Sequence, residues 1–265
     1  MQALLNTAIE AARRAGDLAM RYTKKLDQIE VHSKARNDFV SKVDIAAEEA
    51  IIELIHERYP QHGILGEESG LREGDEHLWI IDPLDGTTNY LHGFPMYAVS
   101  IGLQIKGRMS VGVVYDPNRQ ELFTAIRGVG AQLDGHRIRV KNQQRLEGAL
   151  IGTGFPYRSS DQWMETYLNQ FRAVMQVAGD CRRPGSAALD LCYLAASRLD
   201  GFWEFGLQPW DLAAGSLILR EAGGIISSMT DDGDYMETGN IIAGAPKVHS
   251  DLENLLRPLL TPTMA

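Results

Sequence analysis

The chain is organised around LWIIDPLDGTTN, residues 78–89. This stretch begins as a short apolar run, which is typical of a buried strand. Asp82 and Asp85 follow, three residues apart, and a glycine and two threonines come directly after them. Open α/β sheets bind ligands beyond the carboxyl ends of their strands. We therefore expect this segment to bring two carboxylates to a ligand site at a sheet edge.

The chemistry of this stretch suits a hard cation and a phosphate. Paired carboxylates attract divalent ions that prefer oxygen ligands, and the carbonyl of Leu84 is a candidate further ligand. Gly86 permits close backbone approach, and Thr87 can open a short helix whose first amides bind phosphate oxygens. We predict a magnesium and phosphate site here. The structural alternative is an Asx-type turn followed by a helix cap.

Residue spacing separates this stretch from other phosphate-handling motifs. Haloacid-dehalogenase phosphatases use two aspartates that are two residues apart, whereas Asp82 and Asp85 are three apart. A P-loop requires Gly-Lys, and no such pair occurs in the chain. The nucleophile elbow G-x-S-x-G is also missing from the sequence, and the glycines at 128 and 130 lack the third glycine of a dinucleotide fingerprint.

Acidic residues at three further places in the chain each have an ordinary structural explanation. Glu67 and Glu68 follow a short predicted strand and could form a solvated acidic turn. Asp211 stands in the first turn of a predicted helix, where a carboxylate favours the helix dipole. Asp44 is three residues after Ser41, which is capping-box spacing.

Taken together, these positions argue for a metal site. Separate turns that carry carboxylates next to apolar segments could surround two or three divalent ions, and Mg²⁺ prefers such oxygen ligands. The seven histidines form no H-x-x-x-H pair, which argues against zinc.

Composition indicates an ordinary globular chain. At 265 residues it forms one large domain or two closely packed halves. A formal charge of -9 does not favour nucleic-acid binding as a main task, although a local basic patch could exist.

Cys181 and Cys192 form neither a disulfide framework nor a zinc motif. We expect a reducing cytoplasm, with no signal peptide and no membrane span.

The order of predicted elements indicates an α/β fold whose N-terminal half is closer to α+β. Apolar periodicity predicts helices over residues 2–23 and 41–59, and a polar loop with a short strand near 29–31 follows the first of them. Strands at 64–66, 78–82, 97–105, 109–115 and 121–126 suit antiparallel joins. After about residue 148, strands alternate with helices. We place a soft boundary near 145, so that halves 1–145 and 146–265 form one compact unit.

Three motifs resemble the signature of the inositol monophosphatase family. They are GEES at residues 66–69, WIIDPLDGTTN at 79–89 and WDLAAG at 210–215. The likeness covers nearly the whole chain, and GSAALD at 185–190 resembles the bacterial branch. The resemblance implies a layered αβαβα sandwich of the sugar-phosphatase type.

The resemblance also implies a metal-ligand set. Glu67, Asp82 and the Leu84 carbonyl would hold one Mg²⁺, and Asp82, Asp85 and Asp211 would hold a second. A third, weaker ion would lie near Glu67. Two to three Mg²⁺ ions are therefore expected, and the mechanism has no covalent intermediate.

The same resemblance assigns the remaining site residues. Gly86 and Thr87 would bind phosphate through their amides. Glu67 and Thr87, with Thr87 supported by Asp44, would help to activate the attacking water. Further substrate contacts are expected from Arg182, Gly185, Ser186, Ala187, Glu204 and Asp211.

The implied activity is Mg²⁺-dependent, lithium-sensitive hydrolysis of inositol 1-phosphate or a similar polyol phosphate by a homodimer. Another sugar or nucleotide phosphate remains an alternative, as does a second role with a protein partner in ribosomal-RNA transcription antitermination. The residues leave two side-chain roles open. Glu204 could face solvent from a strand, and Arg182-Arg183 could bind substrate, pair across a dimer interface or lie in solvent.

Overall fold

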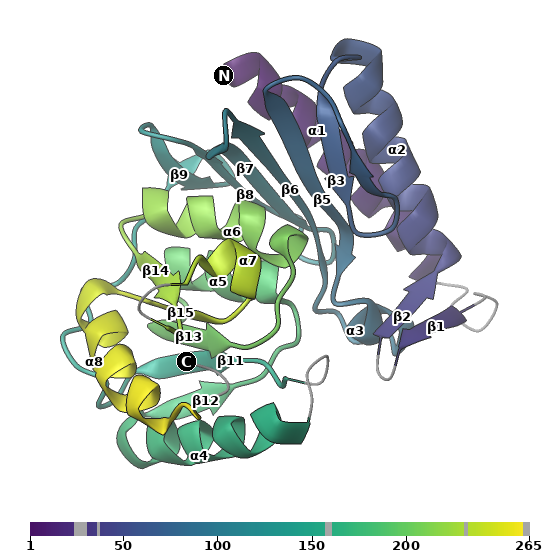
Figure 1. Cartoon of the computed structure of the whole chain (residues 1–265). Coiled ribbons are helices and arrows are strands. Elements are labelled where there is room, and N and C mark those ends of the chain that lie inside the picture. Colours follow the sequence, from purple (N-terminus) through teal and green to yellow (C-terminus); the bar gives the residue numbers. More distant parts are fainter. Residues whose placement is uncertain (24–30, 36–37, 157–160, 231–232, 262–265) are drawn as a thin grey trace.

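The computed structural model describes residues 1–23, 31–35, 38–156, 161–230 and 233–261. Its elements stack in alternating layers of helix, sheet, helix, sheet and helix (Figure 1). The predicted αβαβα sandwich is therefore confirmed. Among the described helices, none is long and apolar enough to cross a membrane.

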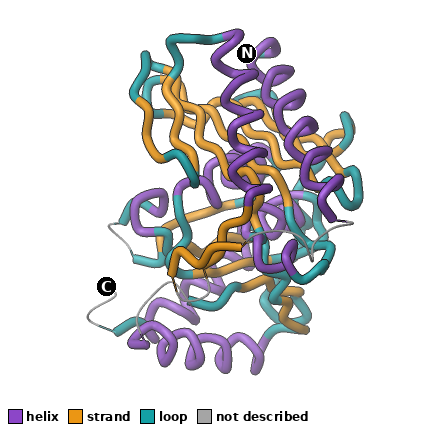
Figure 2. Tube along the Cα trace, turned by 90° about the vertical axis from the view of Figure 1, so that its right-hand side faces the viewer, coloured by secondary structure: helices purple, strands orange, loops and turns teal. Residues whose placement is uncertain are grey.

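An eight-stranded sheet forms the first β layer, in the order β10-β9-β8-β7-β6-β5-β3-β4. Neighbouring strands are antiparallel except β3 and β5, which run parallel. The strands are β3 (Gly63–Gly66), β4 (Gly70–Arg72), β5 (His77–Asp85), β6 (Ala98–Ile105), β7 (Arg108–Asp116), β8 (Glu121–Ile126), β9 (Gly130–Leu133) and β10 (His136–Arg137). Two long helices, α1 (Gln2–Tyr22) and α2 (Lys42–Arg58), lie side by side over one face of this sheet (Figure 2).

The second β layer is a mixed five-stranded sheet, in the order β12-β11-β13-β15-β14. Its strands are β11 (Leu150–Thr153), β12 (Asp180–Arg182), β13 (Gly201–Glu204), β14 (Ile225–Ser228) and β15 (Ile241–Gly244). Between the sheets lie α5 (Ala187–Ala195) and α6 (Pro209–Glu221), and the outer layer contains α4 (Asp161–Val177) and α8 (Pro246–Leu256) (Figure 1). The shorter elements are β1 (Val31–Ala35), β2 (Asp38–Ser41), α3 (Thr87–Leu91), α7 (Tyr235–Thr238) and a 3-10 turn at Arg257–Leu259.

Two glycines allow α6 to pack directly on the first sheet. A Cβ on Gly102 would lie 2.8 Å from the Cβ of Ala213, and one on Gly112 would lie 2.8 Å from the carbonyl oxygen of Ala214. Neither strand position therefore has room for a side chain. The Ser100 hydroxyl donates to the Trp210 carbonyl oxygen at 3.2 Å, and Ser100 pairs with Asp82, so the first turn of α6 lies beside the end of β5.

The long predicted elements are present, and the differences are at ends and edges. β5 continues to Asp85, beyond the predicted end at residue 82. The short edge strands β4 and β10 were not predicted, because two or three residues are too few to show apolar alternation. The strand expected near 29–31 falls mostly outside the described residues. The boundary near residue 145 lies between the last strand of one sheet and the first of the other, and the division into halves stays a prediction.

Candidate metal-dependent active site

A β-bulge brings the two aspartates of β5 together. Asp82 pairs with Ser100 and Asp85 pairs with Ala98, so β5 carries one residue more than β6 over this interval. Residues three apart in a regular strand point to opposite faces. The extra residue of the bulge reverses that alternation, which lets both carboxylates face the same site.

Each aspartate is held by a backbone amide. The amide of Leu84 donates to Asp82 Oδ1 at 2.9 Å. Asp85 Oδ2 accepts from the Ser186 hydroxyl at 2.7 Å and from the amide of Ala188 at 2.8 Å, both at the start of α5. Ser186, one of the predicted substrate contacts, therefore holds a metal-ligand candidate in this structure.

The third carboxylate comes from α6. Asp211 Oδ2 accepts from the amide of Gln208 at 2.7 Å, which closes a capping box at the helix start. Asp211 therefore does occupy the first helical turn, the position favoured by the helix dipole that was given as its structural alternative. This role coexists with membership of the acidic cluster, because single oxygens of Asp82, Asp85 and Asp211 lie within 4.8 Å of one another.

The electrostatics of this cluster fit a hard cation. Burial raises the pKa of Asp82 well above its usual value, and the charges of Glu67, Asp85 and Asp211 raise it further. Three buried carboxylates so close together repel one another unless a positive charge lies between them. Oxygen-only ligands at this spacing suit Mg²⁺.

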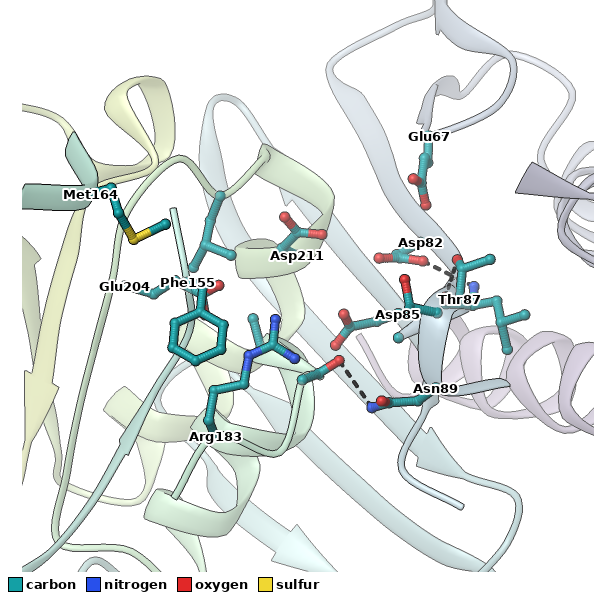
Figure 3. Close-up of a pocket in the computed structure, with 16 residues that line it drawn as sticks. Glu67, Asp82, Asp85, Thr87, Asn89, Phe155, Met164, Arg183, Glu204 and Asp211 are labelled. Atoms are coloured by element: carbon teal, nitrogen blue, oxygen red, sulfur yellow. Dashed lines mark hydrogen bonds between the residues drawn. The ribbon is translucent and has the colours of Figure 1, made fainter. Parts of the chain in front are cut away.

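The remaining predicted catalytic residues surround the same place. Gly86 has a φ of 99°, and a Cβ there would lie 2.8 Å from the carbonyl oxygen of Met96, so only glycine fits this turn. The Thr87 hydroxyl lies 3.0 Å from Asp44 Oδ1 and 3.1 Å from the Leu84 carbonyl oxygen. Glu67 follows β3 and points toward Asp82 and Thr87 (Figure 3).

These groups open into a cavity of about 400 Å³. Its lining includes ten of the predicted site residues, namely Glu67, Asp82, Leu84, Asp85, Gly86, Thr87, Gly185, Ala187, Glu204 and Asp211. Three others lie outside the lining. Asp44 and Ser186 stand behind it and contact Thr87 and Asp85. Arg182 lies on the exposed strand β12 and pairs with Asp180.

Three residues of the cavity lining, Phe155, Met164 and Leu207, were not singled out from the sequence, and the role of a fourth, Arg183, was left open. Phe155, Met164 and Arg183 lie on the side of the cavity opposite Asp82 and Glu67, and the Arg183 guanidinium lies 4.8 Å from the centroid of the Phe155 ring (Figure 3). These residues come from loops and one helix with no shared motif. Of the Arg182-Arg183 pair, it is therefore the second that reaches the cavity.

Asn89, the last residue of the 78–89 stretch, connects the two walls. Its Nδ2 donates to the carbonyl oxygens of Met96 at 2.8 Å and Pro184 at 2.9 Å. The turn that follows β5 is thereby fixed to the loop that carries Arg183 and Gly185. Asn89 lies inside the motif at residues 79–89, and this position could have identified it as a site residue from the sequence.

A second group with metal-binding side chains lies near β5. It contains His62, Asp75 and His77, whose ligand atoms lie within 4.8 Å of one another. The two imidazole rings are stacked at 4.2 Å and are parallel to within 5°. Imidazole lone pairs lie in the ring plane, so two parallel stacked rings cannot both direct a nitrogen at one ion. This geometry does not suit zinc.

Comparison with known proteins supports the family assignment. The sequence profile of the Inositol monophosphatase family matches residues 1–259, so the chain belongs to the inositol monophosphatase family. It is 49% identical over 269 residues to the Nus factor SuhB of Pseudomonas aeruginosa, covering 100% of this chain and 99% of that protein. It is 52% identical over 250 residues to the Nus factor SuhB of Escherichia coli K12, covering 94% and 93%.

Solved structures give the same result. The extragenic suppressor protein suhB from Bartonella henselae matches with a TM-score of 0.93 at 43% identity, covering 96% of this chain and 98% of that one. An inositol monophosphatase from Anabaena (Nostoc) sp. PCC 7120 matches with a TM-score of 0.85 at 38% identity, covering 99% and 98%. Family membership therefore extends across the full fold.

Proposed function

We propose that this chain is a Mg²⁺-dependent phosphomonoester hydrolase that releases phosphate from inositol 1-phosphate or a similar polyol phosphate. The observation that carries the proposal is the buried cluster of Asp82, Asp85 and Asp211, which shares one cavity with the Gly86-Thr87 turn. A related sugar or nucleotide phosphate remains the alternative substrate. We further propose two to three Mg²⁺ ions, inhibition by lithium, a cytoplasmic location and a homodimer.

The three aspartates, with Glu67 and the Leu84 carbonyl, would hold the metal. When bound, Mg²⁺ lowers the pKa of a coordinated water and stabilises charge on attacking and leaving oxygens. The amides of Gly86 and Thr87 would hold the phosphate next to it. No serine, cysteine or histidine nucleophile is needed.

Thr87 and Asp44 would orient the attacking water. When the Thr87 hydroxyl donates to Asp44 Oδ1, its oxygen lone pairs are left to accept a hydrogen bond from that water. Asp44 is fully buried on α2, which fixes the direction of the hydroxyl. Glu67 would accept the other water proton from the opposite side.

At the far end of the cavity, Glu204 would accept hydrogen bonds from substrate hydroxyls. Glu204 is the last residue of β13 and is only 9% exposed, so bulk water competes little with the substrate for its carboxylate. We assign the cationic contact to Arg183, which lines the cavity, in place of Arg182. Its stack on Phe155 gives that guanidinium a fixed direction.

Phosphate release from a panel of polyol, sugar and nucleotide phosphates, with Mg²⁺ varied, tests the proposal. We expect activity on inositol 1-phosphate that EDTA abolishes. Asp85→Asn should lose at least about 100-fold in kcat, because it removes charge from the site where charge develops in the transition state. Full activity of Asp85→Asn, or activity without divalent metal, refutes the mechanism.

A second role with a transcription protein is favoured by the relatives, which carry the name Nus factor SuhB. We propose that such a partner binds a surface separate from the cavity, for which the exposed Arg182 on β12 is a candidate. Pull-down of transcription proteins with Asp85→Asn separates the two roles. Binding that survives Asp85→Asn and is lost in Arg182→Ala supports this surface, and binding lost only in Asp85→Asn contradicts it.

A further inference from the structure

Glu48 is a buried carboxylate outside the residues assigned above. It lies on α2 and is 2% exposed. Its Oε2 accepts from the amide of Glu68 at 2.9 Å, and its Oε1 accepts from the amide of Ser69 at 2.8 Å. Both oxygens therefore bind the backbone of the turn that directly follows Glu67. Hydrogen bonds to an ionised acceptor are roughly twice as strong as neutral ones.

The residue before Glu67 leaves space for this contact. A Cβ on Gly66 would lie 2.6 Å from the carboxylate carbon and both oxygens of Glu48, so the carboxylate occupies the place of a side chain. On the other side, the amide of Glu67 donates to the carbonyl oxygen of Ile81 at 3.1 Å. The backbone at Glu67 is thus fixed between β5 and α2.

The same face of α2 supports both groups that are aimed at the attacking water. Asp44 and Glu48 are four residues apart, one helical turn, and both are buried. Asp44 contacts the hydroxyl of Thr87, and Glu48 holds the turn of Glu67. A single rigid helix therefore sets the separation between Thr87 and Glu67.

We infer that Glu48 is the positioning residue of Glu67, and that it sets the Mg²⁺ affinity of the ion that Glu67 would bind. This inference rests on the proposed function, because it gives Glu67 the role of metal ligand. Glu48 touches neither substrate nor metal in this role. It acts by holding the amides of Glu68 and Ser69, which orders the turn next to Glu67.

The test compares Glu48→Gln with Glu49→Gln, which removes the same charge from an exposed position on the same helix. Amide hydrogen exchange is measured on the metal-free proteins over residues 66–70, and Mg²⁺ affinity is measured by calorimetry. Glu48→Gln should accelerate exchange in this segment and weaken Mg²⁺ binding about tenfold, as expected for loss of a charge-assisted hydrogen bond. Glu49→Gln should change neither quantity.

Gly66→Ala changes the same contact on its β3 side, so it gives an independent test if Glu48→Gln folds poorly. It should reproduce both effects, because the new methyl group must displace the Glu48 carboxylate. Faster exchange with unchanged Mg²⁺ affinity in both variants overturns the inference. A wild-type protein that binds Mg²⁺ but hydrolyses no phosphomonoester refutes the proposed function instead. In that case, the exchange and calorimetry results still decide the role of Glu48.

Discussion

Replacing Ser186 by alanine should weaken both the fold and the metal site. The hydroxyl donates at 2.7 Å to Asp85 Oδ2, and the Asp85 side chain is buried. A hydrogen bond to a charged group contributes about 1.5–3 kcal/mol. Ser186 also caps α5, but its contact to the amide of Leu189 is long, at 3.4 Å, and adds little. Because Ala188 still donates to the same oxygen, we expect a loss of about 2 kcal/mol in the free energy of unfolding.

The assay is urea unfolding of the metal-free protein, followed by a Mg²⁺ titration of activity. Loss of a residue that orients a metal ligand typically costs 10–100-fold in metal affinity, so the Mg²⁺ requirement should rise about tenfold. Ser216→Ala is the matched control, because Ser216 is equally buried and its hydroxyl donates only within α6, to the carbonyl oxygen of Ala213. It should change stability by less than about 0.5 kcal/mol, since alanine suits a helix interior. Equal losses in the two variants, with an unchanged Mg²⁺ requirement, would refute the role given to Ser186.

Two further substitutions test the electrostatics and the substrate end of the cavity. Burial and, after it, the charges of Glu204 and Asp85 raise the pKa of Asp190 in the folded protein well above its ordinary value of 3.8. Protonation of Asp190 therefore favours the folded state fully below about pH 4, and this contribution is lost as pH rises through the raised pKa. Asp190→Asn should therefore become progressively more stable relative to wild type as pH rises above about 4 in urea unfolding, and a difference that is constant with pH contradicts this. Arg183→Ala should raise KM for the phosphorylated substrate about tenfold without changing the Mg²⁺ requirement, which corresponds to one lost charge-assisted contact. Arg182→Ala serves as its control, and equal effects of the two arginine variants in steady-state kinetics would remove the assignment to Arg183.

The sequence could predict the three clustered aspartates because their signal is local. Asp82 and Asp85 follow an apolar strand within one short stretch, and Asp211 stands in a recognisable helix start. The bulge between Asp82 and Asp85 was not predictable from alternation alone, because it depends on pairing with β6. The spacing of three residues separates the stretch from the haloacid-dehalogenase motif, but only the bulge explains how both carboxylates face one site.

The rest of the site depends on long-range packing that the sequence does not specify. The sequence does not distinguish the adjacent residues Arg182 and Arg183. In the structure β12 ends at Arg182, and Arg183, the next residue, lines the cavity. In the sequence, Glu48 is one of several charged residues of a predicted helix, and nothing there distinguishes it from its neighbours. Its role depends on Gly66, which leaves space for the carboxylate, and that meeting of α2 with β3 is tertiary.

The complete site needs both sheets, because its cavity is lined by Asp82 and Asp85 of β5 and by Glu204 at the end of β13. Asp85 extends from the first sheet and is held by α5, whereas Asp211 arrives on α6, which packs closely because Gly102 and Gly112 carry no side chain. Asn89, in the helix after β5, donates a hydrogen bond to the carbonyl oxygen of Pro184, which follows β12 of the second sheet. Without a cation, these contacts must oppose the repulsion among buried carboxylates. A cation that binds only the assembled fold relieves that repulsion, so metal binding and the joining of the two sheets should be thermodynamically linked.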